Sequence, residues 1–218
     1  RDVDSFEEMV AKSKRMALRH HIAASGDRVV LCAGVPFKTP GELGDQAGKN
    51  VWDIGNIGAE PQRAQTIDFT AAYCEIEATY MVPAGSPIKS IAEVDRKGVK
   101  IVTSARSAYG LWLENNIKNA ELIQVQGLDG AFNKFKDDKM DVLAGLRPGM
   151  LKDIEKMPGA RILDGKFSAV QQAIGVAKGN PEAAAWLAAF VEEAKKSGLV
   201  ASFIEKHKVK GLSVAPLA

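Results

Sequence analysis

What this 218-residue sequence has little of already excludes several classes of protein. Its 29 Lys and Arg nearly balance its 27 Asp and Glu, so a net charge of +2 gives no reason to expect nucleic acid or an anionic membrane surface as a partner. No apolar run approaches the ~18 residues that a membrane-spanning helix needs. The opening residues, RDVDSFEEMV, lack the apolar segment of a signal peptide.

Cysteine and histidine are equally scarce. Cys32 and Cys74 each lie in an apolar, strand-like stretch, a setting that favours buried thiols, although a disulfide between them stays open. The three histidines, His20, His21 and His207, have no metal-ligand spacing. We therefore expect no metal ion and no cofactor.

Motifs of enzyme chemistry are missing as well. The sequence has no GxSxG, GxxxxGK[ST], GxGxxG, HExxH or CxxC pattern. Its neighbouring carboxylates, at 137–138 and 192–193, belong to charged segments that favour solvated helix faces. No nucleophile and base can be paired from the residues, so the sequence predicts a protein that is not an enzyme.

The composition that remains, 46% hydrophobic and 26% charged, is typical of a globular chain of one large or two small domains. Strand-like and helical segments alternate along it, which predicts an α/β fold. Strands are expected at 28–33, 51–57, 70–82, 99–104, 121–126, 140–146, 160–165 and 168–179. Helices are expected at 5–24, 39–48, 86–95, 107–117, 128–138, 149–157 and 199–207.

The clearest helix follows Asn180, a good N-cap, with Pro181 at the first helical position. Gly198 is expected to end it. Apolar residues recur along it at helical spacing and predict one face that packs on a sheet. They are Ala183, Trp186, Leu187, Phe190, Val191 and Ala194.

Two segments, 80–87 and 172–180, end long strands in Pro, Gly or Asn and are candidate crossings between domains. They divide the chain into one lobe of residues 1–82 plus 176–218 and a second lobe of residues 83–175. Two lobes joined by two extended crossings form a hinge, and small ligands prefer the cleft between such lobes.

The stretch GNIGAEPQR suits the capture of an anion. Gly55 and Gly58 allow a ligand to approach the backbone, and Pro61 lies where a short helix with an anion-favouring N-terminus would begin. Arg63 can hold a carboxylate with two parallel hydrogen bonds. A surface arginine paired with Glu60 explains the same residues, and the stretch alone leaves both interpretations open.

Residues 51–82, VWDIGNIGAEPQRAQTIDFTAAYCEIEATYMV, resemble the signature of the family 3 extracellular solute-binding proteins of ABC importers. The likeness continues through SPIKSIAEVDRKGVKIVTS, RSAYGLWL, DVLAGLR and VQQAIGVAKG, and covers most of the chain from about Trp52. The resemblance implies a two-lobed periplasmic-binding-protein fold of type II, with a hinge of two extended crossings.

The resemblance also implies a ligand site. The family's carboxylate-binding arginine falls on Arg63, and the assisting loop groups fall on Asn56 and Gly58. A GTT-like turn that opens a helix of the second lobe here reads RSA, so that Arg106 replaces the usual glycine and Ser107 keeps a hydroxyl. Ser107 also fits a plain N-cap. Near the second crossing, two further candidates for the cleft are Gln171 and Gln172.

Two features depart from the family. Amino-acid binders usually have an acid shortly after the "DV" strand, and that place falls on Leu146, followed by Arg147. The change implies a ligand without an α-ammonium group, or one with a second anionic group that Arg147 binds; Arg147 also fits a plain surface position. Residues 1–50 predict a helix first, where the family opens with a central strand.

The resemblance therefore implies a periplasmic or extracytoplasmic, monomeric protein that captures a small carboxylate-bearing solute, an amino acid or an organic acid. It would present this solute to the permease of an ABC importer. One alternative is an enzyme on the same scaffold, similar to the cyclohexadienyl dehydratases, with Glu60 or Glu77 as the acid. Another is the sensor domain of a receptor.

Overall fold

A computed structural model describes residues 54–218. The predictions for earlier residues, including the helix at 5–24, the strand at 28–33 and the state of Cys32, lie outside this part of the chain.

The described residues alternate between strands and helices, which confirms the predicted α/β fold. The strands are β1 (Ile54–Ala59), β2 (Ile67–Phe69), β3 (Cys74–Val82), β4 (Lys100–Ser104), β5 (Glu121–Val125), β6 (Val142–Leu146), β7 (Arg161–Ile162), β8 (Ser168–Ala177) and β9 (Leu212–Val214). The α-helices are α2 (Ala108–Asn116), α3 (Leu128–Asp137), α4 (Arg147–Asp153), α5 (Pro181–Lys196) and α6 (Leu199–His207). Short 3₁₀ turns are η1 (Arg63–Gln65), η2 (Ile91–Glu93) and η3 (Ile154–Lys156).

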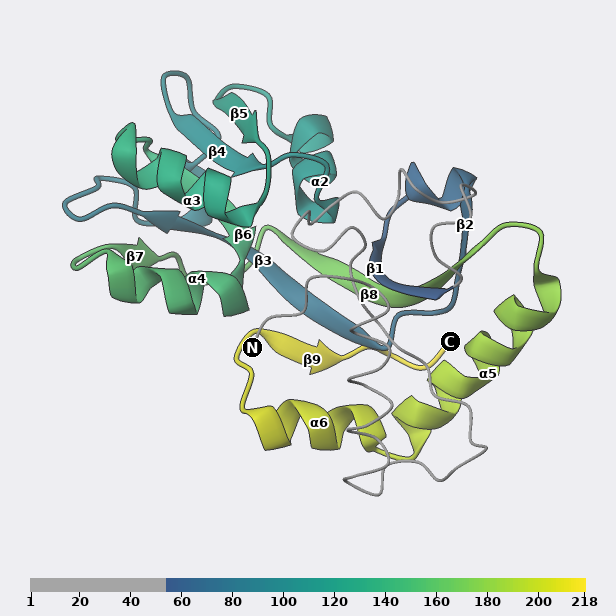
Figure 1. The fold of residues 1–218 in the computed structure, drawn as a ribbon. Helices are drawn as coiled ribbons and strands as arrows, with labels where there is room; N and C mark the ends of the chain where they lie inside the picture. The colour runs from purple at the N-terminus through teal and green to yellow at the C-terminus, as the bar shows by residue number, and fades with distance from the viewer. Residues whose placement is uncertain (1–53) are drawn as a thin grey trace, which may run out of the picture.

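One curled sheet runs through both halves of the molecule in the order β1-β8-β3-β6-β4-β5. The first part of β3 pairs with β8 and β9, and its last part pairs with β6 and β7, always antiparallel. Figure 1 shows α2, α3 and α4 gathered around β4, β5 and β6, and α5 and α6 beside β1, β8 and β9. The long strands β3 and β8 therefore connect the two groups.

The half that holds α2, α3 and α4 is built on parallel strands, because β4 pairs in parallel with both β5 and β6. Apolar residues alternate along β3, so that Tyr80 and Val82 pack with Leu113 of α2, whereas Met81 packs with Phe135 of α3. Helix α2, which follows β4, packs on one face of the sheet, and α3, which precedes β6, packs on the other face. The carboxyl ends of β4 and β6 thus form the switch point where open α/β sheets bind ligands.

Helix α5 begins as the sequence predicts. The Asn180 side chain accepts a hydrogen bond from the backbone N–H of Ala183 at 3.1 Å, and Pro181 is the first helical residue. Leu187 and Val191 are buried against Ile174 and Val176 of β8, as expected for a helix that packs on a sheet.

The prediction is wrong for two residues of that face. Trp186 is 59% exposed and Phe190 is 43% exposed, and their rings stack on each other with centroids 5.6 Å apart. The apolar face of α5 is wider than the part of the helix that contacts β8, so Leu187 and Val191 are buried but Trp186 and Phe190 are not. Other boundaries shift by a few residues: β3 starts at Cys74, and β9 was not predicted.

Candidate functional site

The loop after β1 is held by the side chain of Glu60 and is followed by a 3₁₀ turn, not by an α-helix. The carboxylate of Glu60 accepts hydrogen bonds from the backbone N–H groups of Gln62 at 2.8 Å and Arg63 at 3.3 Å. The helix predicted from Pro61 is only the three-residue 3₁₀ turn Arg63–Gln65. Glu60 thus shapes the turn, and a long helix N-terminus does not supply the anion-favouring field expected there.

Arg63 links the two halves of the molecule. Its side chain is buried, with the whole residue 9% exposed. Nη1 donates to the carbonyl oxygen of Gly58 at 2.9 Å, and Nη2 donates to the carbonyl oxygen of Arg106 at 2.7 Å. Gly58 belongs to β1, and Arg106 follows β4 at the switch point, so one guanidinium contacts both halves of the molecule.

The start of α2 confirms Ser107 as an N-cap. Its hydroxyl accepts from the N–H of Gly110 at 3.0 Å and donates to the carbonyl oxygen of Ser104 at 2.8 Å. In this arrangement its one proton is used within the turn. Arg106 has a φ of 59°, a left-handed conformation that favours glycine. Its carbonyl faces Arg63, while its side chain is exposed.

Gly58 is the point where β1, β8 and α2 come closest. A Cβ atom built on Gly58 would lie 2.7 Å from Cγ1 of Val170, 3.0 Å from Cβ of Ala108 and 3.6 Å from Nη1 of Arg63. Real Cβ atoms essentially never show the shortest of these separations. Glycine at this position therefore lets the loop, the crossing strand and the second-lobe helix meet beside the guanidinium.

Strand register decides which predicted residues share the face of Gly58. Gly58 pairs with Gln172, which pairs in turn with Cys74 of β3. Because paired residues lie on the same face and every second residue repeats it, one face carries a continuous row across four strands. We call this the front face; it consists of Asn56, Gly58, Cys74, Ile76, Ala78, Leu146, Val170 and Gln172.

Two other predicted residues lie on the opposite face. Gln171 Nε2 donates to Glu75 Oε1 at 3.1 Å, and Arg147 Nε donates to Glu77 Oε2 at 2.5 Å. Arg147 Nη2 also donates to the carbonyl oxygen of Gly165 at 2.6 Å. We call this the back face; it consists of Glu75, Glu77, Arg147, Lys166 and Gln171.

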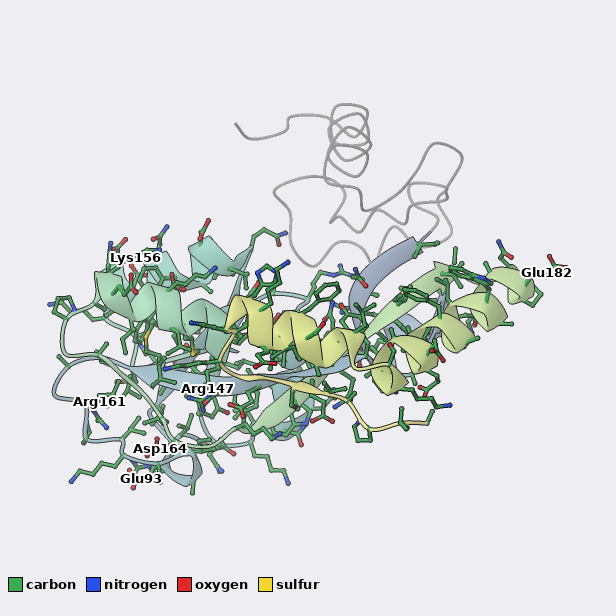
Figure 2. The ribbon with its side chains drawn as sticks, turned by 90° about the horizontal axis from the view of Figure 1, so that it is seen from below. Glu93, Arg147, Lys156, Arg161, Asp164 and Glu182 are labelled. Atoms are coloured by element: carbon green, nitrogen blue, oxygen red, sulfur yellow. The ribbon has the colours of Figure 1, made fainter. Side chains whose placement is uncertain are left out.

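Arg147 also reaches the other half of the molecule on the back face. A Cβ built on Gly211 would lie 2.9 Å from the Cβ of Arg147, so the side chain packs directly on the backbone between α6 and β9. Figure 2 labels Arg147 beside this part of the chain. Its partners are thus Glu77 of β3 and backbone groups of Gly165 and Gly211, and not Arg63 or its loop.

Ionisation near the front face is controlled by burial. Burial raises the pKa of the Cys74 thiol to about 11 and raises that of Tyr109, next to Val170, to about 12. Cys74 is a free, buried thiol, as the sequence favoured. Both groups are neutral at physiological pH, so the buried layer beneath the front face is uncharged.

Neither a metal site nor a membrane span adds to this picture within residues 54–218. In that part of the chain, no three or more His, Cys, Asp or Glu side chains gather in a way that could hold a metal ion. The helices among these residues are also too short or too polar to cross a bilayer.

Solved structures similar to this chain define its fold class. The solute receptor for L-cysteine of Neisseria gonorrhoeae is 20% identical with a TM-score of 0.68, over 81% of this chain and 75% of that one. The substrate-binding protein of an amino acid ABC transporter is 17% identical with a TM-score of 0.68, over 91% and 85%. The ancestral amino acid-binding protein AncCDT-1, a precursor of cyclohexadienyl dehydratase, is 19% identical with a TM-score of 0.65, over 77% and 74%.

These neighbours are two-lobed periplasmic binding proteins, which confirms the predicted type II fold. Among curated proteins, no significant match is found. The model of the bacterial extracellular solute-binding proteins, family 3, matches residues 39–210, and the chain belongs to this family.

Sequence reasoning named Asn56, Gly58, Arg63, Ser107 and Gln172, and the structure brings their backbones to one region. It did not find Val170 and Ala108, which contact the Gly58 position from two other elements. It also missed the back-face pair of Glu77 and Arg147. The alternation of Glu75, Ile76, Glu77 and Ala78 carried a signal for two chemically distinct faces.

Proposed function

We propose that this protein captures a small carboxylate-bearing solute between its lobes and delivers it to the permease of an ABC importer. The observation that carries the proposal is Arg63, a buried guanidinium that contacts the backbone of both lobes at the switch point of the sheet. A guanidinium in that place can bind a carboxylate through two parallel hydrogen bonds, at a site largely shielded from water. Membership of a solute-binding family supports the same conclusion.

In this proposal the front face is the ligand side. Arg63 holds the carboxylate, Asn56 and Gln172 orient it from β1 and β8, and the close approach at Gly58 leaves its backbone accessible. Arg106 and Ser107 act through the backbone of the turn that opens α2, where N–H groups favour an anion. Arg147 and Gln171 are not assigned to the ligand, because their contacts are with Glu77 and Glu75 on the back face.

Ligand binding would close the lobes about β3 and β8. We place the second lobe at residues 83–175 and the first at residues 1–82 plus 176–218, with the two crossing strands as the hinge. A ligand that touches Arg63 and the α2 turn together stabilises the closed arrangement through contacts from both lobes. Like other family 3 extracellular proteins, it would act outside the cytoplasm, as a monomer.

Binding is favoured over catalysis on this scaffold. Among the described acids, Glu60 accepts from two backbone N–H groups and Glu77 pairs with Arg147 on the back face. Both candidate acids are thus engaged by groups of the protein itself. The neighbour that is a precursor of cyclohexadienyl dehydratase is itself an amino acid-binding protein.

The test is thermal unfolding of protein freed of bound ligand by refolding, against a panel of amino acids and small organic acids. A ligand at about 100 times its Kd stabilises the fold by ~2.7 kcal/mol, which raises the Tm of a chain of this size by roughly 5–10 °C. We expect the rise in wild type and a loss of most of it in Arg63→Lys, which keeps the charge but loses the planar fork.

Arg161 provides the matched control. Its guanidinium also donates to two carbonyl oxygens, those of Ser86 and Ile88, but within one lobe. Arg161→Lys is expected to keep the full ligand-induced rise. An equal loss of the rise in both variants, or no rise with any compound in wild type, would contradict the proposal.

A further inference from the structure

Leu146 occupies the front face at the carboxyl end of β6, on the switch point described above. It pairs with Ala78 of β3 and packs against the buried cluster of Ala78, Tyr109 and Val170. Ile76 and Ala108 border the same cluster. The partly accessible side chains that cover this cluster are therefore hydrocarbon: Ile76, Ala108, Leu146 and Phe167.

The acids of β3 are turned away from that surface. Glu75 and Glu77 alternate with Ile76 and Ala78, so both carboxylates lie on the back face. There Glu77 forms an ion pair with Arg147. Glu75 accepts a hydrogen bond from Gln171, and its Oε2 lies 4.0 Å from Nζ of Lys166. The carboxylate of Glu60, in the loop before Arg63, accepts from backbone N–H groups of its own turn.

Arg147 is held in the same way. Its guanidinium binds Glu77 and the carbonyl oxygen of Gly165, and its stem packs on Gly211. The sequence left two interpretations of the Leu146–Arg147 step: a ligand without an ammonium group, or a ligand with a second anionic group on Arg147. Since Arg147 points to the back face, the contacts favour the first interpretation.

We propose that Leu146 is a specificity-determining residue, and that the site selects carboxylates with an apolar body and no cationic amine. The inference rests on the proposed function, because Arg63 is taken to hold the carboxylate. An ammonium group enclosed beside Leu146, Ile76 and Ala108 would lose its hydration without gaining a counter-ion from these side chains. That loss is large for a buried charge, whereas a hydrocarbon group gains by the same transfer.

The experiment compares acids and amino acids of identical carbon skeleton on ligand-free wild-type protein by isothermal titration calorimetry. The pairs are butanoate with 2-aminobutanoate, 4-methylpentanoate with L-leucine, and 3-phenylpropanoate with L-phenylalanine. We expect the acid of the best-bound pair to bind at least about tenfold more tightly than its amino acid, since burial of an unpaired ammonium costs more than 1.4 kcal/mol, the equivalent of a tenfold change.

Leu146→Asp tests the residue itself, and Leu146→Asn is the control of equal size without charge. A carboxylate at position 146 is expected to reverse the preference towards the amino acid, and the amide is not. The wild-type comparison stands even where a variant fails to fold. A preference of wild type for the amino acids overturns the inference but leaves the proposed function intact. Failure of both series to bind wild type overturns the proposed function, and the inference with it.

Discussion

The front and back faces of the β3–β8 pair are built from the same two strands and carry opposite chemistry. On the front, Ile76, Ala78 and Val170 present hydrocarbon beside the guanidinium of Arg63. On the back, Glu77 pairs with Arg147, and Glu75 lies near Lys166 and accepts a hydrogen bond from the amide of Gln171. The comparison shows how a period of two lets one pair of strands serve a ligand side and a hinge side at once.

The two faces also hold the lobes together differently. The front contact between the two halves joins Gly58 of β1 to Ala108 of α2 through apolar surface, beside the hydrogen bond from Arg63 to the carbonyl oxygen of Arg106, and it can separate without breaking an ion pair. The back contacts tie the first residue of α4 to β3 and to the backbone near Gly211. Movement of the lobes should therefore change the front more than the back, and four experiments probe the two faces.

The largest expected effect comes from adding one methyl group to a buried glycine. A Cβ on Gly175 would lie 2.7 Å from Cγ2 of Ile67 and 3.2 Å from Cγ2 of Ile57, within the paired strands β1, β2 and β8. Gly175→Ala should lower the free energy of unfolding by ~2 kcal/mol, because a packed core cannot give way. Gly58→Ala meets Cγ1 of Val170 at the same 2.7 Å, so it should cost a similar amount of stability, but it should also weaken ligand binding because it lies beside Arg63.

Urea unfolding and ligand titration of these two variants measure both quantities. Unchanged ligand affinity in Gly58→Ala would contradict a ligand site beside Gly58, and Gly175→Ala is the control that should leave the affinity unchanged.

The next effect concerns the ion pair on the back face. Arg147 and Glu77 are partly exposed, with side chains 19% and 37% accessible, so their coupling is expected to be only ~1 kcal/mol. A double-mutant cycle of Glu77→Ala and Arg147→Ala measures it by urea unfolding. The ligand-induced rise in Tm should survive in all three variants. If the ligand-induced rise in Tm is lost in Arg147→Ala alone, Arg147 contacts the ligand and the back-face assignment is wrong.

A smaller gain in stability is expected at two strained residues. Arg106 and Lys139 both have positive φ, 59° and 52°, so glycine at either place should stabilise the fold by about 0.5–1 kcal/mol. Only Arg106 borders Arg63, so only Arg106→Gly should alter ligand affinity. Chemical denaturation and titration of both variants check this, and a matching change of affinity in Lys139→Gly would refute the assignment.

The smallest effect appears only in alkaline solution. Burial raises the pKa of Tyr109 to about 12, so this phenol stays neutral in the fold while a tyrosine of the unfolded chain ionises near pH 10. Its contribution to stability is present below pH 10 and is lost as the pH rises towards 12. Urea unfolding at pH 9 and pH 11 should show a smaller loss for Tyr109→Phe than for wild type, and equal losses would contradict the burial effect.

Local features of this fold were predictable because they depend on neighbours in the sequence. Asn180 and Pro181 define the start of α5, and Ser107 caps α2, through contacts three residues apart. The exposure of Trp186 could not be predicted, because helical spacing gives the direction of a face but not the width of the surface that covers it.

The site was predictable only in part. The Arg63 loop was found by its resemblance to a family, whereas the bond from Arg63 to the Arg106 carbonyl joins residues 43 positions apart. The same limit applies to Arg147 and Glu77, which are 70 positions apart. Their pairing depends on the register of β3 with β6, a long-range property that local periodicity does not determine.

The pairing of β3 with β8 has a mechanical consequence. Residues 74–78 pair with residues 168–172, and further strands flank them, since residues 74–76 also pair with β9 and residues 171–172 also pair with β1. The two long strands therefore pass between the halves of the molecule as neighbours in one sheet, and not as separate segments. Because paired strands share one twist, the lobe closure proposed above would twist β3 and β8 together rather than bend either strand alone.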